Sequence, residues 1–175
     1  NSLLDLLVFG RAAGTHIVEF ASRTKSHKPL PANPADLSLS RLNRLDSSAS
    51  GEYAQDVAND IRASMQRHAG VFRTQASMDE GVVKIADIRE RVKVFNTARI
   101  EALEVENLIE CAQATMVSAA ARRECRGAHT VSDYERPADD AVAPLGRDDA
   151  NWMKHTLWHS ATNSLTYKPV NLKPM

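Results

Sequence analysis

Two histidines near the carboxyl end of the sequence, His155 and His159, have a spacing that is compatible with metal binding. On a helix, side chains four residues apart lie on one face and can share an ion. We interpret this stretch as a strand, in which the same spacing puts both side chains on one face but about 13 Å apart. Because the sequence shows no third ligand beside them, we predict no metal site here.

The run Arg126-Gly127-Ala128-His129 is a second candidate, because it follows the end of a predicted helix. His129 could serve as an acid, a base or a ligand. A histidine after a helix end more often hydrogen-bonds a backbone carbonyl, and we favour that interpretation. We expect Arg126 to be a helix-end cation or an ion-pair partner rather than a substrate clamp.

The amino end of the opening stretch is the third candidate. Ser2 and Asp5 have the spacing of a capping box. A helix that starts here leaves the amides of Ser2 and Leu3 free, with about half a positive charge, and such ends bind anionic groups of ligands. The alternative is that Ser2 is only an N-cap, which the residues alone favour.

The residues after this amino end are apolar on every side of the predicted helix, from Leu3 to Phe9. A helix that is apolar all round is a buried helix. Gly10 and Gly14 each cost about 1 kcal/mol relative to Ala, which suggests close packing against another backbone. We therefore expect a central helix whose neighbours lie in other segments of a longer polypeptide.

Composition excludes several classes of function. The balance of 22 basic and 22 acidic residues argues against nucleic acid as the main partner. Cys111 and Cys125 are too few for a disulfide framework, and we expect buried or half-buried free thiols. No apolar run approaches the roughly 20 residues of a membrane span. Without a glycine-rich phosphate loop or a nucleophile paired with a base, the residues predict a helical module rather than a complete enzyme.

Apolar periodicity predicts the elements that carry these candidates. The first helix extends to about Ser22 and is followed by a linker with three prolines. An amphipathic helix over 37–46 comes next, and then a one-sided helix over about 53–73 that includes Phe72 on its apolar stripe. These helices would precede the longer helical stretch that leads to His129.

Two more helices and a hairpin complete the prediction. Ser77 with Glu80 forms a capping box that opens one helix. The other begins near Asn96 and ends near Glu124, with Gly127 as its C-cap. Helices with one apolar stripe and short connections predict an antiparallel bundle.

After the last helix, residues 131–149 are polar and predict a surface loop. The segments 152–158 and 164–167 then flank a turn over 160–163. This pattern predicts a β-hairpin that contains both His155 and His159.

The opening stretch, Asn1 to Gly14, resembles the segment that closes the flavin domain of succinate dehydrogenase flavoprotein subunits. Later motifs resemble the same family in the same order. Residues 95–104 resemble the start of its long C-terminal helix, and residues 125–129 resemble its Ser-Arg-Gly-Ala-His motif with Cys in the first position. Residues 148–157 and 167–174 resemble its terminal region. The family includes fumarate reductases, which run the same reaction in reverse.

The resemblance implies a mainly α fold with four parts. Residues 1–24 would be the last helix of the FAD-binding domain, and residues 25–36 a Pro-rich linker. Residues 37–130 would form an antiparallel three-helix (spectrin-repeat-like) bundle. Residues 131–175 would form a loop and a small C-terminal β-hairpin.

The resemblance also implies a reaction, in which succinate is oxidised to fumarate by hydride transfer to FAD. Ser2 and Leu3 match the family's flavin contacts, which reverses our interpretation of Ser2 as a plain N-cap. No catalytic residue carries over, because the family's catalytic and flavin-bonding residues lie in upstream segments. We expect the parent protein to be an enzyme, and this chain alone to be inactive and to retain no FAD.

The implied partners are an iron–sulfur subunit, membrane anchor subunits and a quinone. The implied location is peripheral, on the inner face of the cytoplasmic or mitochondrial inner membrane. Two alternatives stay open, a fumarate reductase flavoprotein and an inactive helical module that docks the iron–sulfur subunit. Because the opening helix lacks its natural neighbours, we also expect this chain to self-associate.

Overall fold

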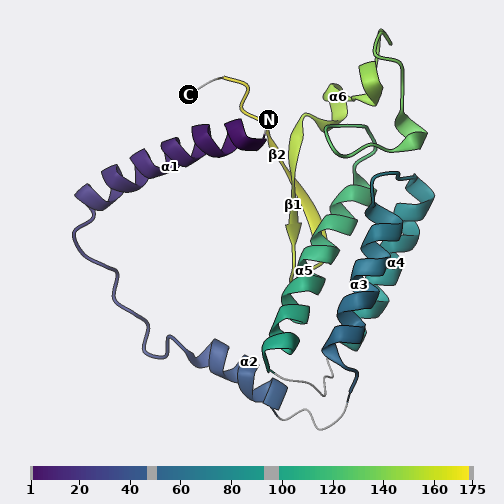
Figure 1. Ribbon diagram of the computed structural model, residues 1–175. Helices are drawn as coiled ribbons and strands as arrows, with labels where there is room; N and C mark the ends of the chain where they lie inside the picture. Colours follow the sequence, from purple (N-terminus) through teal and green to yellow (C-terminus); the bar gives the residue numbers. More distant parts are fainter. Residues whose placement is uncertain (1, 47–50, 93–98, 174–175) are drawn as a thin grey trace. The chain divides into compact units, whose positions relative to one another are not determined.

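The computed structural model describes residues 2–46, 51–92 and 99–173, and the chain divides into two compact units after Ser40. The first unit consists of helix α1 (Ser2–Arg23), an irregular segment that contains three prolines, and the start of α2 (Asp36–Asp46) (Figure 1). Prolines remove the amide donors that a helix needs, so the segment between α1 and α2 stays irregular.

The apolar side chains of α1 are exposed in the first unit. Leu3 is 77% exposed, and every large apolar side chain from Leu4 to Phe9 is more than half exposed. The described residues of this unit therefore supply no cover for a helix that is apolar on every side. Such a surface is typical of a helix that packs against another domain or chain.

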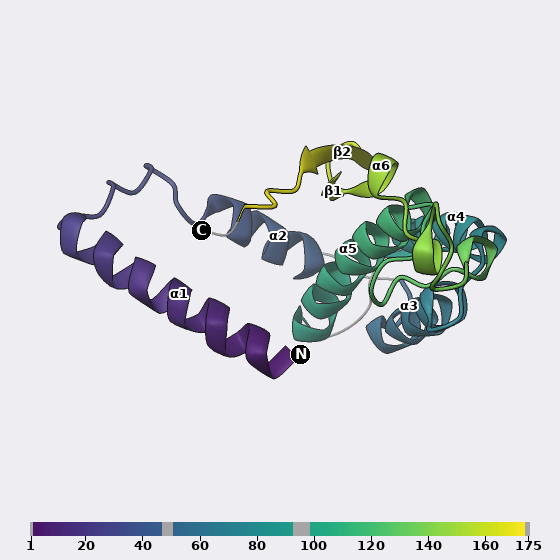
Figure 2. The same cartoon turned by 90° about the horizontal axis from the view of Figure 1, so that it is seen from above.

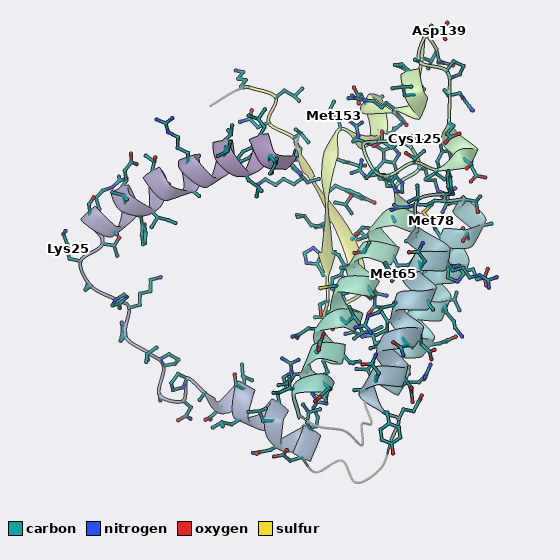
Figure 3. The ribbon with its side chains drawn as sticks, viewed as in Figure 1. Lys25, Met65, Met78, Cys125, Asp139 and Met153 are labelled. Carbon is teal, nitrogen blue, oxygen red and sulfur yellow. The ribbon has the colours of Figure 1, made fainter. Side chains whose placement is uncertain are left out.

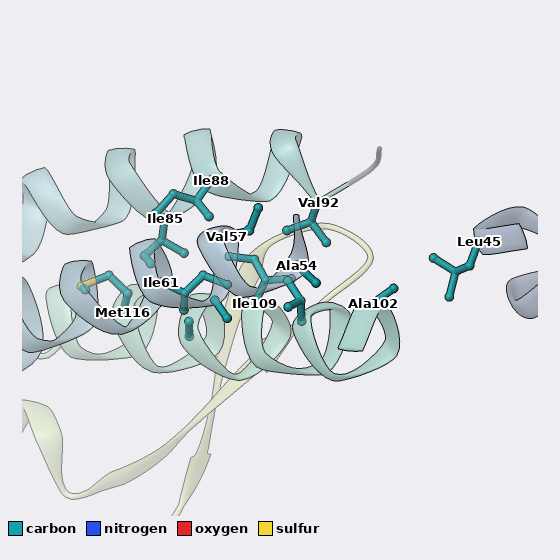
Figure 4. Packing of buried hydrophobic residues seen from close by; sticks show 13 residues of the cluster. Leu45, Ala54, Val57, Ile61, Ile85, Ile88, Val92, Ala102, Ile109 and Met116 are labelled. Atoms are coloured by element: carbon teal, nitrogen blue, oxygen red, sulfur yellow. The ribbon is translucent and has the colours of Figure 1, made fainter. Parts of the chain in front are cut away.

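The second unit is built on three long helices, α3 (Ala54–Ala69), α4 (Gln75–Arg91) and α5 (Arg99–Ala121). They lie side by side and run antiparallel to their neighbours along the chain (Figures 1 and 2). The core between them is apolar (Figure 4). Its fully buried large side chains include Val57, Ile61, Ile85, Ile88 and Met116. The predicted antiparallel three-helix bundle is thus confirmed.

The end of α3 differs from the prediction. The helix stops at Ala69, and Phe72, which was predicted to lie on the apolar stripe, is 91% exposed. Gly70 explains the stop, because it leaves the helical conformation there and a Cβ at this position would lie 2.4 Å from the carbonyl oxygen of Gln66. The connection to α4 therefore presents Val71 and Phe72 to solvent.

The start of α4 also needs a correction, because Thr74 rather than Ser77 is the N-cap. The Thr74 hydroxyl accepts a hydrogen bond from the amide of Ser77 at 3.1 Å. The Ser77 hydroxyl instead lies 3.3 Å from Nδ1 of His68. The capping residue thus lies three positions before the serine that the capping-box pattern singled out.

Replacing Thr74 by Ala should lower the free energy of unfolding by about 1 kcal/mol, because one amide of the first turn loses its acceptor. Urea denaturation followed by circular dichroism measures this loss. The matched control is Ser77→Ala, which removes a hydroxyl but no cap and should cost less. A larger loss for Ser77→Ala than for Thr74→Ala would contradict the assignment of the cap.

The last long helix ends three residues earlier than predicted, at Ala121 rather than Glu124. Gly127 is not its C-cap. It lies in a separate turn, in the left-handed region with a φ of 59°. The predicted start near Asn96 falls outside the described residues. Cys111 is exposed on α5, one position away from the buried Ala112, whereas Cys125 is buried as expected.

The remaining residues form a loop region and a hairpin. Short helical turns at Ser132–Tyr134 and Pro144–Gly146 precede α6 (Asp149–Trp152). Strands β1 (Lys154–His159) and β2 (Ser164–Pro169) pair antiparallel, and β1 lies beside α5 (Figure 1). The hairpin prediction is confirmed, although Trp152 belongs to α6 rather than to the strand. In the described part of the chain, no helix has the length and apolarity that a membrane crossing requires.

Candidate functional site

The amino end of α1 is the part of the first unit that the sequence singled out. The helix begins at Ser2 and continues for 22 residues, with Asp5 in its first turn. The first amides of a helix have no partner within the helix, so they point outward as donors. Leu3 is largely exposed beside them. Both predicted cofactor contacts thus lie at a helix end whose amides can donate hydrogen bonds to an anionic or oxygen-rich group.

A second constellation lies at the end of α5, around the buried carboxylate of Glu124. Its side chain accepts hydrogen bonds from Arg122 at 2.6 Å and from two nitrogens of Arg126 at 2.7 and 2.9 Å. The amide of Asp148 donates a further hydrogen bond at 2.9 Å. Arg126 also reaches Asp149 of α6 at 2.6 Å. We call Arg122, Glu124, Arg126 and Asp149 the Glu124 cluster.

The charges in the Glu124 cluster stabilise one another. Burial disfavours the charged form of Glu124, but the hydrogen bonds from Arg126, the Asp148 amide and Arg122 outweigh it and hold its pKa below the ordinary value. The hydrogen bond to Glu124, and then that to Asp149, raise the pKa of Arg126. The cluster is therefore an ion pair network with both signs of charge matched, as we expected for Arg126.

Arg122 extends the Glu124 cluster to the hairpin. Its guanidinium donates to the carbonyl oxygens of Trp152 at 3.0 Å and Lys154 at 2.7 Å. It also lies 5.2 Å from the centre of the Trp152 ring. On the same side, the Lys154 ammonium lies 4.0 Å from the ring centre of Tyr167, on β2. The contacts of Arg122 attach the hairpin to the end of the bundle, whereas the contact between Lys154 and Tyr167 lies within the hairpin.

His129 lies beside the Glu124 cluster and connects two segments. Its Nε2 is 2.9 Å from the carbonyl oxygen of Arg122, so the interpretation as a histidine bonded to a backbone carbonyl is confirmed. Its Nδ1 is 3.0 Å from Nη1 of Arg73, in the connection between α3 and α4. Burial, above all, lowers the pKa of His129, and the nearby Arg73 and Arg122 act in the same direction. The imidazole is therefore held in its neutral form.

Two glycines allow the backbone to fold tightly around these side chains. Gly127 permits a turn in which Arg126 and His129 exchange backbone hydrogen bonds of 2.8 and 3.1 Å. Gly146 has a φ of 78°, and a Cβ there would lie 2.2 Å from the carbonyl oxygen of Tyr134. Its own carbonyl accepts from the amide of Cys125 at 2.8 Å. Cys125 itself packs near Met78 at this end of the bundle (Figure 3).

The structure places the two histidines of the possible metal site, His155 and His159, on the hairpin. They lie on the same face of β1, as the strand interpretation predicted, and that face is exposed. His159 Nε2 is 2.8 Å from the hydroxyl of Thr166 on β2. Within the described ranges, no group of three or more His, Cys, Asp or Glu side chains could hold a metal ion.

Sequence reasoning missed the residues that organise this end of the molecule, namely Glu124, Arg73 and Asp149. Glu124 could have been recognised in the sequence as an ion-pair partner, because Arg122 and Arg126 each lie two residues from it. Arg73 gave no signal, since it is 56 residues from His129 in the sequence. The chemistry of the assembled residues is that of a structural network, in which each charged group already has a partner.

Comparisons with known proteins agree on one family. The model of the family described as "Fumarate reductase flavoprotein C-term" matches residues 58–175. The succinate dehydrogenase flavoprotein subunit of Coxiella burnetii is 38% identical over 99% of this chain, and the fumarate reductase flavoprotein subunit of Haemophilus influenzae is 32% identical over 98%. The chain spans 29% of the length of each of these relatives.

A solved quinol–fumarate reductase with menaquinol molecules shows the same fold. It superposes with a TM-score of 0.76 at 30% identity, over 100% of this chain and 31% of the solved one. The match therefore includes α1 as well as the bundle and the hairpin. The chain belongs to the succinate dehydrogenase and fumarate reductase flavoprotein family, in which it matches the C-terminal part.

Proposed function

We propose that this chain acts as the C-terminal part of a flavoprotein subunit that oxidises succinate to fumarate by hydride transfer to FAD. The observation that carries the proposal is the 38% identity to a succinate dehydrogenase flavoprotein subunit over nearly the whole chain. On this proposal, the parent protein passes electrons to an iron–sulfur subunit and a membrane quinone. It would be peripheral on the inner face of the membrane, in a complex with anchor subunits.

The amides of Ser2 and Leu3 are the groups of this chain that we propose contact FAD. When bound, FAD would supply the acceptor for the electron pair and the proton that leave succinate as hydride. The free amides at the amino end of α1 fit an oxygen- and nitrogen-rich edge of such a group, because they can only donate. They would stabilise negative charge there by about 1 kcal/mol, which corresponds to roughly 20 mV in a two-electron potential.

The bundle would have a supporting role on this proposal. Residues 1–24 would close the flavin domain, residues 25–36 would form a linker, and residues 37–130 and 131–175 would form the helical bundle and its extension. The exposed apolar surface of α1 supports the first assignment, because the flavin domain would cover it. The same exposed surface supports self-association when the chain is studied by itself.

Two alternatives each have an observation in their favour. The likeness to a quinol–fumarate reductase supports the reverse reaction, fumarate reduction. The exposed Val71 and Phe72 support a docking module for an iron–sulfur subunit, with no activity of its own. We favour succinate oxidation because the chain is 38% identical to the Coxiella burnetii succinate dehydrogenase subunit and 32% identical to the Haemophilus influenzae fumarate reductase subunit.

The purified chain, mixed with FAD and passed over a desalting column, should show no bound-flavin absorbance and no bleaching with succinate. A chimera in which the chain replaces the aligned part of the Coxiella burnetii subunit should retain flavin and bleach with succinate, as the unmodified subunit does. The control is that subunit with the aligned part deleted. Succinate-dependent bleaching by the chain alone would contradict the proposal, and so would a flavin-loaded chimera that does not bleach.

A further inference from the structure

The hydrogen bonds of His129 define one tautomer. Its Nε2 faces the carbonyl oxygen of Arg122, which can only accept, so Nε2 carries the hydrogen. Its Nδ1 faces the guanidinium of Arg73, which can only donate, so Nδ1 is the acceptor. Both contacts therefore require a neutral ring. A proton added at Nδ1 would place two donors and two positive charges 3.0 Å apart.

The charged groups around His129 come from each segment packed against it. Arg73 belongs to the connection between α3 and α4, Arg122 follows α5, and Arg126 lies in the same turn as His129. The carboxylate of Glu124 also acts on the ring, but its oxygens already accept from Arg122 and Arg126. The neighbouring cations would therefore oppose protonation of His129. Of the three arginines, Arg73 has the fewest other hydrogen bonds to hold its side chain in place.

Arg73 has an alternative partner in the cleft that it lines. Besides His129, the Arg73 side chain bonds the carbonyl oxygen of Gly70 at 2.7 Å. Glu135 lines the same cleft as Arg73, together with Ala128 and Thr130 among others. Among the residues that the structure describes, none forms an ion pair with the Glu135 carboxylate. A released Arg73 guanidinium thus has a carboxylate within the cleft.

We propose that His129 and Arg73 form a proton-sensitive latch, in which neutral His129 holds the connection between α3 and α4 and protonated His129 releases Arg73 toward Glu135. The latch controls residues 70–74, which present Val71 and Phe72 to solvent. It is independent of the proposed reaction, because it uses only contacts within the second unit.

The direction of the response follows from the environment of the ring. Burial and the two arginines hold the pKa of His129 below 6.5. The latch is therefore closed at neutral pH, and it opens only as the pH falls through the lowered pKa of His129 in the folded protein. As the pH falls, His129 is protonated at a higher pH in the unfolded chain than in the folded protein. The free energy of unfolding should therefore decrease with falling pH until His129 is also protonated in the folded protein.

Nuclear magnetic resonance of the 175-residue chain tests the latch. The imidazole signals of His129 and the amide signals of residues 70–73 should titrate with one shared midpoint below pH 6.5. In Arg73→Ala, the midpoint of His129 should rise toward its ordinary value, because a like charge is removed. In Glu135→Gln, it should fall by about half a pKa unit, the effect of an exposed ion pair lost from the open state.

His129→Gln supplies the control, since a neutral amide can still accept a hydrogen bond from Arg73 but does not titrate. The amide signals of residues 70–73 should then lose their pH response. A response that persists in His129→Gln would overturn the latch. So would a midpoint of His129 that is unchanged in both Arg73→Ala and Glu135→Gln. Arg73→Ala keeps the test valid if His129→Gln does not fold.

Discussion

Replacing Glu124 by Ala is expected to lower the free energy of unfolding of the bundle by about 3–5 kcal/mol. The Glu124 side chain has no exposed surface, while those of Arg122 and Arg126 are only 15% and 27% exposed. Removing the carboxylate leaves two largely buried cations without their shared partner. The amide of Asp148 also loses its acceptor, so α6 and the hairpin should loosen together.

Urea denaturation measures this loss, with the far-ultraviolet circular dichroism of the helices as the signal. The control is Glu104→Ala, an exposed glutamate on α5, which should change stability by less than about 0.5 kcal/mol. Glu124→Gln should be intermediate, because it keeps the shape and one acceptor but not the charge. A loss below about 1 kcal/mol in Glu124→Ala would show that the cluster is not the attachment point described above.

The same carboxylate predicts a dependence on pH. Because the pKa of Glu124 is lower in the folded protein than its ordinary value of 4.5, its stabilising contribution is complete above that value. The contribution is lost as the pH falls from 4.5 through the lower pKa of the folded state. Glu124→Gln should therefore lose less stability between pH 5 and pH 3 than the unmodified chain.

Replacing Ile85 by Ala is expected to cost about 2–5 kcal/mol, the range for large-to-small changes in a packed core. Ile85 has no exposed surface and lies with Ile61 and Met116 between the three helices (Figure 4). Denaturant unfolding again provides the measurement. Val83→Ala, on the same helix but 62% exposed, is the matched control and should cost less than about 0.5 kcal/mol. Equal losses in the two variants would contradict the core packing.

Most of the helical architecture could be predicted because its signal is periodic and local. Val57 and Ile61 on α3, like Ile85 and Ile88 on α4, recur at helical spacing and are all buried. The boundaries were less predictable, because they depend on single residues with competing partners. Phe72 continues the apolar period in the sequence, but Gly70 ends the helix before it.

The types of interaction at the candidate site could be predicted from the sequence, but the residues that take part in them from distant segments could not. A bond from His129 to a backbone carbonyl and an ion pair for Arg126 follow from their place after a helix. The identities of Arg73 and Asp149 depend on how distant segments meet, which spacing along the chain does not encode. Ser2 and Leu3 differ again, since their role comes from a resemblance and stays a proposal.

The close approach of Gly146 to Tyr134 has a consequence for how the chain can vary in length. The two residues bound the loop 135–145, and their backbones are already in contact. Tyr134 is further held by Gln75, and Gly146 by Cys125, so both ends are fixed by residues outside the loop. For a loop whose ends already meet, doubling its length costs only about 0.6 kcal/mol of closure entropy. Insertions between residues 135 and 143 should therefore be tolerated without displacing the hairpin.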